Sequence, residues 1–436
     1  MSNIANPTRT DRGGTEATAV PARAATALAV LLLTVAIISF RPFQPAGAEG
    51  ATGGDLVNQL GYGLLGALAA CGLLTLTNRR VLAALLSPWW LLLLVLLSLS
   101  VMHAPSPPEA MRAALFTLIG ILVMATVLIL PPDADGFSTV LATVSLAVLG
   151  LCYYGIVARP DVAIHGAGGL EPQHAGLWRG SFSHKNIAAP VMACLAFMGL
   201  YLWRRHWRWS GGTILVLALF FIANTGSKTT LGTVPLAMLL VILPGLCGLR
   251  FLAPVFLVAA IAGAALATLG IALFEPLSEL QRHYFPGLTY TGRTELWAFM
   301  GEMLAERPWT GYGLESFWGS DLVRFSDQPF DRAWDIRGIV HGHNAYMDLA
   351  IAMGLPALLV AIIAFILAPM RDYLRVPPLK ENVLLADLFL MIVAFTLLDA
   401  FLESFFFRRA DPVWLLMVFA IFGLRLVARF PVSGAR

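Results

Sequence analysis

The sequence has few charged residues for its length. Only 13% of its 436 residues are Asp, Glu, Lys or Arg, whereas 58% are hydrophobic. Soluble domains carry about 25% charged residues, so this chain has more apolar side chains than one soluble core can use. The composition excludes an ordinary soluble domain and predicts an integral membrane protein, whose organisation is best analysed by counting spans.

Basic stripes and paired cysteines are also missing. The net charge is +3, and the arginines are scattered between apolar runs, so no nucleic-acid partner is expected. The four cysteines lie in or beside apolar runs without a Cys-x-x-Cys spacing. They predict core packing, and they indicate neither a disulfide nor a metal site.

Long apolar runs account for most of the chain. They are continuous rather than alternating, so they predict helices and not the strands of a barrel. The predicted fold is therefore all-α, a polytopic bundle of about twelve transmembrane helices. The predicted spans are 24–40, 56–76, 82–102, 113–130, 137–157, 187–203, 211–226, 231–248, 251–274, 344–367, 384–402 and 412–428.

These spans divide the chain into five parts. Residues 1–22 are polar and predict a disordered cytoplasmic N-terminus, and the apolar run after them is predicted to be a retained span and not a cleaved signal peptide. Residues 23–274 hold nine spans, residues 275–343 form a long polar loop with short helices, and residues 344–428 hold three spans. Residues 429–436 form a cytoplasmic tail.

Lys and Arg residues predict the orientation in a bacterial inner membrane. With the N-terminus inside, clusters such as Arg79-Arg80 and Arg204-Arg205 fall in cytoplasmic loops. An even number of spans then puts both termini in the cytoplasm and the 275–343 loop in the periplasm. Seven of the eight histidines fall on the periplasmic side, namely His103, His165, His174, His184, His283, His341 and His343.

Two motifs at or near the ends of the long loop carry candidate functional residues. Arg293, in Gly292–Trp297, is expected at the positive end of a short helix, where a guanidinium and free N–H groups can bind an anion. The alternative is an interfacial arginine paired with Glu295 or with a lipid phosphate. His343 and Asn344 open the tenth span, and a neutral imidazole there can accept a proton from a sugar hydroxyl. The alternative for His343 is a helix cap.

Further outer-face cations come from three other segments. Lys228 follows Ser227 in a polar break between two spans, which lacks the spacing of a phosphate-binding loop and can also be a simple turn. His184 and Lys185 end the outer loop before the sixth span, and Arg112 opens the fourth span. Arg179 is a fifth possible cation. Each is ordinary alone, and their common side of the membrane is the argument for a site.

Two features resemble sites without supporting one. Asp133 and Asp135 have the Asp-x-Asp form of metal-dependent transferases, but they lie in a short cytoplasmic turn, where aspartates serve as turn or cap residues. His341-x-His343 offers only two of the ligands that zinc needs, so no metal is expected.

The aromatic residues of the long loop can stack on sugars or pack the loop, and they are Trp309, Tyr312, Phe317, Trp318, Phe325, Phe330 and Trp334.

In this order, the motifs resemble the bacterial O-antigen ligase and polymerase superfamily. An arginine on the fourth span is followed by Gly-Ser-Phe-Ser-His-Lys-Asn at 180–186, Ser-Lys-Thr at 227–229, Gly-Arg-Thr-x-x-Trp at 292–297, Pro-Trp-x-Gly-Tyr-Gly at 308–313 and His-Asn at 343–344. The resemblance extends from about residue 56 onward, and its ordered set of motifs is more specific than any one of them. The run at 183–186 looks more like exopolysaccharide polymerases than ligases.

The resemblance implies a membrane glycosyltransferase of GT-C-like architecture that inverts the sugar configuration and uses no metal, nucleotide or other cofactor. Its donor would be an undecaprenyl-pyrophosphate-linked glycan, and its acceptor a second glycan or lipid A-core. Arg293 and Lys228 would hold the pyrophosphate, although related ligases carry arginine in place of Lys228. His343 would be the catalytic base, and Arg112, Lys185, His184 and Asn344 would complete the substrate-binding set.

Several other functions also fit the sequence. A polymerase, a ligase acting on lipid A-core and a ligase acting on a protein all fit the motifs, and a polymerase implies a chain-length regulator as a partner besides membrane lipids. A transporter is the main alternative from another class, because twelve spans suit many carriers. Asp387 and Asp399 lie toward the two ends of one span rather than at its middle, and no internal repeat is evident, which disfavours a carrier.

Overall fold

The structure is a computed structural model that describes residues 19–44, 56–76, 79–168, 172–286, 290, 292–325 and 335–434. Among these residues the chain is all-α, as predicted, with one isolated bridge between Ile164 and Trp178. Residues 1–18, most of the segment predicted to be disordered, lie outside the described residues. Thr291, Phe330 and Trp334 lie outside them as well.

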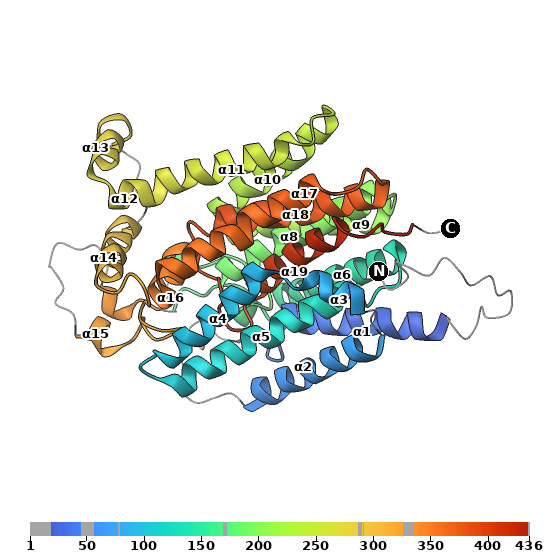
Figure 1. Ribbon diagram of the computed structural model, residues 1–436, viewed down its shortest axis with the longest axis horizontal. Coiled ribbons are helices and arrows are strands. Elements are labelled where there is room, and N and C mark those ends of the chain that lie inside the picture. Colours follow the sequence, from blue (N-terminus) through green and yellow to red (C-terminus); the bar gives the residue numbers. More distant parts are fainter. Residues whose placement is uncertain are drawn as a thin grey trace.

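The helices pack side by side into an elongated bundle (Figure 1). Two pairs, α11–α12 and α16–α17, are each continued through a five-residue π-helical turn, Leu266–Gly270 and Ile363–Leu367. The α-helices are α1 (Ala19–Ile38), α2 (Leu56–Leu76), α3 (Arg79–Leu85), α4 (Pro88–Met102), α5 (Pro107–Ile129), α6 (Ala134–Ala158), α7 (Pro160–Ala163), α8 (Lys185–Arg204), α9 (Arg208–Thr225), α10 (Lys228–Leu246), α11 (Leu252–Ala265), α12 (Ile271–Leu273), α13 (Glu275–Tyr284), α14 (Arg293–Glu306), α15 (Asp321–Arg324), α16 (Ala345–Ile362), α17 (Ala368–Leu374), α18 (Lys380–Asp399) and α19 (Pro412–Val427).

Each predicted span falls on one helix of the bundle or on two consecutive ones. Among the described residues, nine helices are long and apolar enough to cross a membrane, and three shorter apolar helices, in α1, α4 and α19, bring the total to twelve. The helix boundaries differ from the predicted ones where a proline starts a helix. The predicted span 82–102 is split into α3 and α4 because Pro88 starts a new helix, and α5 begins at Pro107, six residues before its predicted start.

Burial separates a central group of helices from a peripheral one. In α18, 89% of the apolar window is buried inside the protein, and in α8 the share is 78%. For the span formed by α11 and α12 the share is only 22%. A helix that is apolar all round belongs either in a core or against lipid, so α18 and α8 form the core and α11–α12 presents most of its surface to the membrane.

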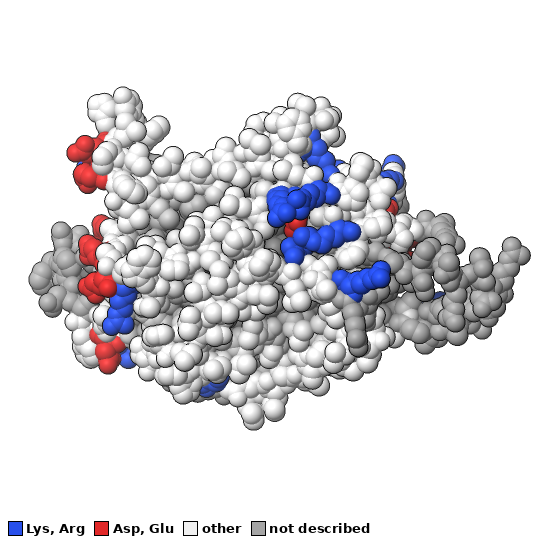
Figure 2. Space-filling view, in the orientation of Figure 1, with Lys and Arg blue, Asp and Glu red and all other residues white. Residues whose placement is uncertain are grey.

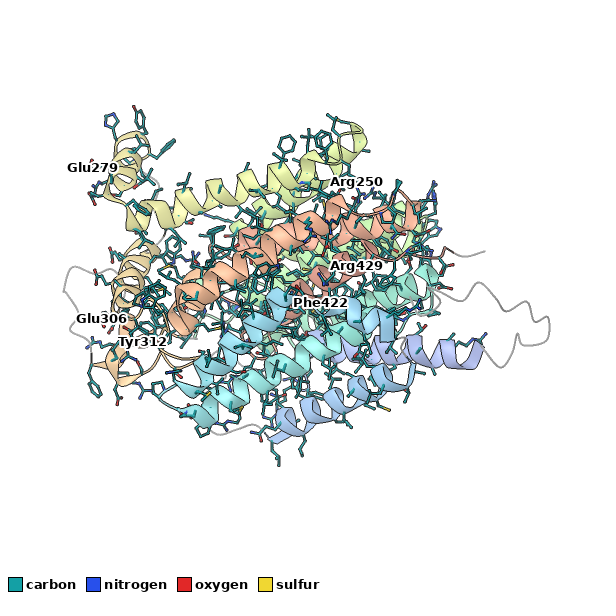
Figure 3. The ribbon with its side chains drawn as sticks, in the orientation of Figure 1. Arg250, Glu279, Glu306, Tyr312, Phe422 and Arg429 are labelled. Atoms are coloured by element: carbon teal, nitrogen blue, oxygen red, sulfur yellow. The ribbon has the colours of Figure 1, made fainter. Side chains whose placement is uncertain are left out.

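The two ends of the bundle differ in charge. In the view of Figure 2, Lys and Arg side chains gather at one end, and Asp and Glu dominate the other. We call the first the arginine-rich end and the second, which carries α13, α14 and α15, the loop end. Figure 3 places Arg250 and Arg429 at the arginine-rich end and Glu279, Glu306 and Tyr312 at the loop end.

Ion pairs fasten the helices together at the arginine-rich end. Arg205, only 8% exposed, donates to Glu381 at 2.8 Å and also pairs with Asp135. Asp387 accepts from Arg204 at 2.9 Å and from Arg250 at 3.2 Å. Asp133 caps α6 by accepting from the amide of Gly136 at 2.8 Å. The carboxylates of the Asp-x-Asp motif and of α18 therefore serve helix packing at this end.

The long loop has a small hydrophobic core of its own. Tyr312 and Phe317 pack against residues of α14 and α16, and Trp318 donates to Asp348 at 2.7 Å. Trp309 and Phe325 are instead 76% and 80% exposed. Packing of the loop accounts for the buried aromatic residues, so Trp309 and Phe325 are the remaining candidates for contact with a sugar among the aromatic residues that the structure describes.

The long loop is attached to the bundle at a break in helix α16. Gly354 has φ 81° and ψ 170°, which interrupts the helix. The segment 308–313 lies against the break, where the amides of Tyr312 and Gly313 donate to the carbonyls of Ile351 and Ala352 at 2.7 and 3.1 Å. The amide of Leu355 donates to the carbonyl of Pro308 at 2.8 Å. Backbone groups freed within a membrane span need partners, and the loop supplies them.

We predict that Gly354→Ala destabilises the protein by more than about 2 kcal/mol, because only glycine adopts this backbone conformation readily. The added Cβ would also fall against the carbonyl of Trp309 and lie 2.9 Å from the amide nitrogen of Thr310. Thermal unfolding of the detergent-solubilised protein measures the effect as a lower Tm.

Gly232→Ala is the matched control, since Gly232 lies within α10 with nothing within 4 Å of an added Cβ. Alanine should be neutral or stabilising there. If both variants unfold at the same temperature as the wild-type protein, the break at Gly354 is not the constraint described here.

Candidate active site at the loop end

His343 lies at the start of α16, and its neighbour fixes the helix end. Asn344 is completely buried and caps α16 by accepting from the amide of Met347 at 3.0 Å. Its side-chain nitrogen donates to the carbonyl of Phe401 at 3.1 Å, and its own amide donates to the hydroxyl of Ser404 at 3.0 Å. Asn344 therefore holds the helix end, and with it His343, against the segment 400–411.

The backbone before His343 is clamped from two sides. The amide of Gly342 donates to the two carboxylate oxygens of Asp348 at 3.0 and 2.9 Å, and the indole of Trp297 donates to the carbonyl of Gly342 at 2.9 Å. His343 itself has φ 49°. Because these contacts come from α14 and α16 at once, they set the direction in which the imidazole leaves the backbone.

Glu403 joins three segments of the chain at one carboxylate. It lies in the connection between α18 and α19, and its side chain is 16% exposed. One oxygen accepts from the side chain of Asn186 at 3.0 Å and lies 3.5 Å from the guanidinium of Arg293. The other lies 3.6 Å from Nδ1 of His343. The long loop, the tenth span and the start of α8 thus meet at this residue.

The charges around Glu403 shift two pKa values. Burial alone would raise the pKa of the Glu403 carboxyl, but the contact with His343 and the charges of His343, Arg293 and His184 hold it below its ordinary value of 4.5. Burial, and then the charges of His343, Arg408, Arg293 and His184, hold the pKa of His341 well below 6.5. At neutral pH the site therefore contains an ionised Glu403 and a neutral His341.

Arg293 occupies the helix position that the sequence predicted. It is the first residue of α14, directly after Gly292, which has φ 79°. Its side chain is 20% exposed and reaches Glu403 at 3.5 Å. A guanidinium at this distance is close enough to be attracted and too far for a short charge-assisted hydrogen bond, so an incoming anion can compete for it.

His184 and Lys185 lie beside Asn186, one of the partners of Glu403. His184 caps α8 by accepting from the amide of Asn186 at 3.1 Å, and Lys185 is only 8% exposed. The ring of His184 lies 5.0 Å from that of His165 and 5.5 Å from that of His174. No group of three or more His, Cys, Asp or Glu in the described part of the chain is arranged to hold a metal ion.

Lys228 and Arg112 are not joined to this cluster. Lys228 is exposed at the start of α10, and Arg112 lies 3.9 Å from Glu109 on the first turns of α5. No hydrogen bond or ion pair between described residues links either side chain to Glu403, Arg293 or His343. Arg179 is buried and donates to the carbonyls of Gln44 and Ser183 at 3.1 and 2.7 Å, which ties two loops together.

Segment 400–411 contributes charged residues that were not predicted from the sequence. Glu403 follows directly on a predicted span, and Arg408 and Arg409 come soon after it. Arg409 lies 3.2 Å from Glu315 of the long loop, and the charge of Arg408 acts on His341. Two adjacent arginines in a loop predicted to be periplasmic oppose the positive-inside rule, and that signal would have found them.

We predict that Glu403→Gln lowers the free energy of unfolding by about 1–3 kcal/mol at neutral pH, since a buried charged partner of three side chains is lost. Because the pKa of Glu403 is depressed in the folded protein, its stabilising effect is complete above about pH 4.5. It is lost as the pH falls through the lower, folded-state pKa. Thermal unfolding of both proteins across this pH range should show the difference shrinking in acid.

Glu275→Gln is the control, because Glu275 and its partner Arg282 are both largely exposed. An exposed pair contributes little to stability, so this variant should unfold like the wild-type protein. A Glu403→Gln protein as stable as the control at neutral pH would show that Glu403 does not hold the three segments together.

Comparison with known proteins gives a family match for part of the chain. Residues 213–362 match the family model described as O-antigen ligase, and no curated protein matches the chain. The match spans α9 to α16 and so contains Lys228, Arg293, His343 and Asn344, whereas Arg112, His184, Lys185 and Glu403 lie outside it. It supports a membrane enzyme that handles lipid-linked glycans. Residues 213–362 are thus similar to the O-antigen ligase family, which agrees with the resemblance seen in the sequence motifs.

Proposed function

We propose that this protein transfers a glycan from an undecaprenyl-pyrophosphate-linked donor to a sugar hydroxyl at the periplasmic face of the bacterial inner membrane. The observation that supports this most directly is the convergence of Arg293 and His343 on Glu403, with separations of 3.5 and 3.6 Å. An anion-binding group and a proton acceptor are thereby held next to each other, as a displacement with a charged leaving group requires.

The reaction is a single displacement at the anomeric carbon. The acceptor oxygen forms a bond to that carbon while the bond to the pyrophosphate oxygen breaks, and the electron pair leaves with the pyrophosphate. His343 takes the proton of the acceptor hydroxyl, and Arg293 stabilises the negative charge that develops on the pyrophosphate. One displacement inverts the configuration of the sugar, and neither a metal ion nor a nucleotide takes part in these steps.

Glu403 acts on both of these residues as a positioning group. Its carboxylate faces Nδ1 of His343, which leaves Nε2 for the acceptor hydroxyl and stabilises the imidazolium that forms when the proton is taken. The same carboxylate attracts Arg293 before the donor binds. Asn344 has its side-chain groups engaged in the helix cap, so its part in this scheme is to fix His343 and not to bind the glycan.

The remaining cations are proposed to extend the donor site. Lys228 is exposed and makes no ion pair with a described residue, so it is free to approach a phosphate that enters from the membrane. Lys185 and His184 lie next to Asn186, whose side chain donates to the same oxygen of Glu403 that faces Arg293. Arg112, more exposed and bridged only to Glu109, would meet the glycan farther from the reacting carbon.

Polymerisation of exopolysaccharide or O-antigen repeats is the reaction we favour, because residues 183–186 look like those of exopolysaccharide polymerases. A chain-length regulator would then be a partner. Ligation to lipid A-core is the second candidate, and the description of the matching family model favours it. Mass analysis of the product distinguishes the two, since a polymerase gives a ladder on the lipid carrier and a ligase gives glycan on lipid A-core.

The orientation predicts where reporter fusions are active. From the positive charge at the arginine-rich end we infer that this end faces the cytoplasm. Fusions after Gly136, Arg208 and Arg375 should therefore report a cytoplasmic location, and fusions near Gly168 and Phe325 a periplasmic one. A cytoplasmic signal at Phe325 would put the cluster around Glu403 on the wrong side of the membrane for this function.

Loss of the leaving-group contact should be visible at Arg293. Arg293→Ala should abolish most turnover, and Arg293→Lys should restore only part, because a point charge cannot replace the guanidinium fork. Lys228→Arg should be tolerated, since related ligases carry arginine there. Turnover of purified protein at matched abundance measures these effects, with Arg282→Ala on exposed α13 as the control. Full activity of a correctly inserted Arg293→Ala protein would place the pyrophosphate elsewhere.

Loss of the base should be visible at His343. General-base catalysis contributes typically about 10²–10⁴-fold, so His343→Ala should lose about that much rate while the protein still folds. His343→Gln should not restore it, because an amide cannot take the proton. The comparison is product formed by His343→Ala, His341→Ala and His184→Ala at matched membrane abundance. Near wild-type output from His343→Ala, with a large loss from His184→Ala, would transfer the role of base to His184.

A further inference from the structure

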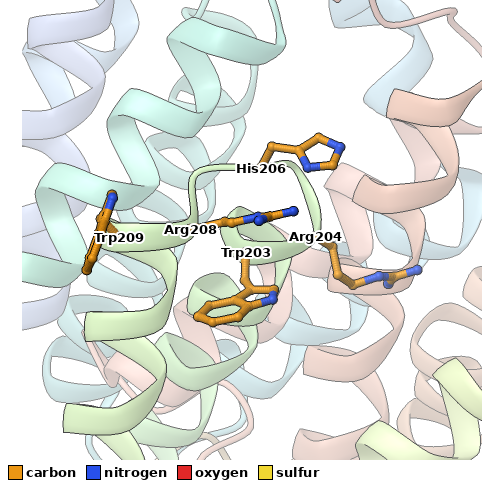
Figure 4. Close-up of a pocket in the computed structure, with 5 residues that line it drawn as sticks. All are labelled: Trp203, Arg204, His206, Arg208 and Trp209. Atoms are coloured by element: carbon orange, nitrogen blue, oxygen red, sulfur yellow. The ribbon is translucent and has the colours of Figure 1, made fainter.

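An open hollow of about 770 Å³ lies at the arginine-rich end, far from the cluster around Glu403. It lies where α8 turns into α9 (Figure 4). Every side chain that lines it is either an indole or a group that is or can become positively charged. The lining residues are Trp203, Arg204, His206, Arg208 and Trp209.

Backbone packing fixes the turn that carries these residues. His206 has φ 73°, and the amide of Trp207 donates to the carbonyl of Leu202 at 2.9 Å. Behind the turn, α8 and α9 approach closely at glycines. A Cβ on Gly211 would lie 2.7 Å from the carbonyl oxygen of Gly199, so neither helix can move inward. The hollow is therefore a fixed feature of the helix hairpin.

The charges of the hollow are only partly neutralised. Arg204 donates to Asp387 at 2.9 Å on the side of the bundle. Arg208 is exposed, and its side chain makes no hydrogen bond or ion pair with any described residue. With no acidic side chain in the lining, the hollow attracts an anion, and Arg208 is the residue best placed to bind one.

The two indoles indicate what kind of anion fits. Trp209 is 92% exposed and Trp203 is 49% exposed, and they belong to the ends of two spans. Tryptophan at a span end lies at the level of lipid headgroups, with its ring against the acyl-chain boundary. A small soluble anion would gain nothing from these rings, whereas a lipid brings phosphate and apolar surface together.

We propose that this hollow binds the headgroup of an anionic phospholipid of the cytoplasmic leaflet, with the phosphate on Arg208 and Arg204 and the upper acyl chain along Trp209. The guanidiniums and the indoles line one hollow at the ends of two spans, so they can contact the phosphate and the acyl chain of one lipid together. Binding here would anchor the α8–α9 hairpin to the leaflet. This site does not rest on the glycosyltransferase activity, and it acts on the opposite end of the bundle.

The test is native mass spectrometry of the full chain in detergent, titrated with dioleoyl phosphatidylglycerol. One basic residue near a phosphate contributes enough to change the binding constant of the first lipid about fivefold. Arg208→Gln should therefore weaken that binding about fivefold, and Arg208→Gln with Trp209→Ala should weaken it further. Arg375→Gln, which removes an exposed arginine of the same end outside the hollow, should leave it unchanged.

Three results would overturn the proposal. The first is equal binding of phosphatidylglycerol by Arg208→Gln and Arg375→Gln. The second is equal affinity of the wild-type protein for phosphatidylcholine, which would show that the headgroup charge is not recognised. The third is displacement of phosphatidylglycerol by millimolar inorganic phosphate, which would make the hollow a site for a soluble anion. Thermal unfolding of each variant confirms that the comparison is made on folded protein.

Discussion

The carboxylate of Glu403 is the contact on which the arrangement of the loop end depends. Arg293 belongs to the long loop, His343 to the mouth of the tenth span and Asn186 to the start of α8, and all three meet this one side chain. Burying a guanidinium, an imidazole and an amide close together costs free energy unless a partner binds them, and Glu403 is that common partner. The pKa of Glu403 is lowered for the same reason, because these neighbours favour its ionised form.

That convergence requires a rigid support. The break at Gly354 lets segment 308–313 complete the hydrogen bonding of α16, so the loop is attached to the bundle by backbone groups as well as by its aromatic core. Trp297 and Asp348 then hold Gly342 from opposite sides. The proposed role of His343 as a base requires a fixed side-chain direction, and these contacts fix the backbone from which its imidazole leaves.

Much of this was predictable from the sequence, and the rest was not for a physical reason. Continuous apolar runs predicted an all-α polytopic membrane protein, because a membrane leaves the backbone few alternatives. The sequence also placed Arg293 at the first turn of a helix. It could not show that Asn344 binds the carbonyl of Phe401, 57 residues away, or that Glu403 binds the side chain of Asn186, 217 residues away. Such contacts depend on the three-dimensional path of the chain, which local sequence patterns do not reveal.

The central claim is that the cluster around Glu403 transfers a lipid-linked glycan by one displacement. Its most direct test is to incubate the purified full-length protein, in liposomes and with a metal chelator, with an undecaprenyl-pyrophosphate-linked oligosaccharide and an acceptor. The account predicts release of undecaprenyl pyrophosphate in step with glycan transfer, and a new glycosidic bond whose anomeric configuration, read by NMR, is opposite to that of the donor. A retained configuration, or turnover that appears only when a divalent metal is added back, would contradict it.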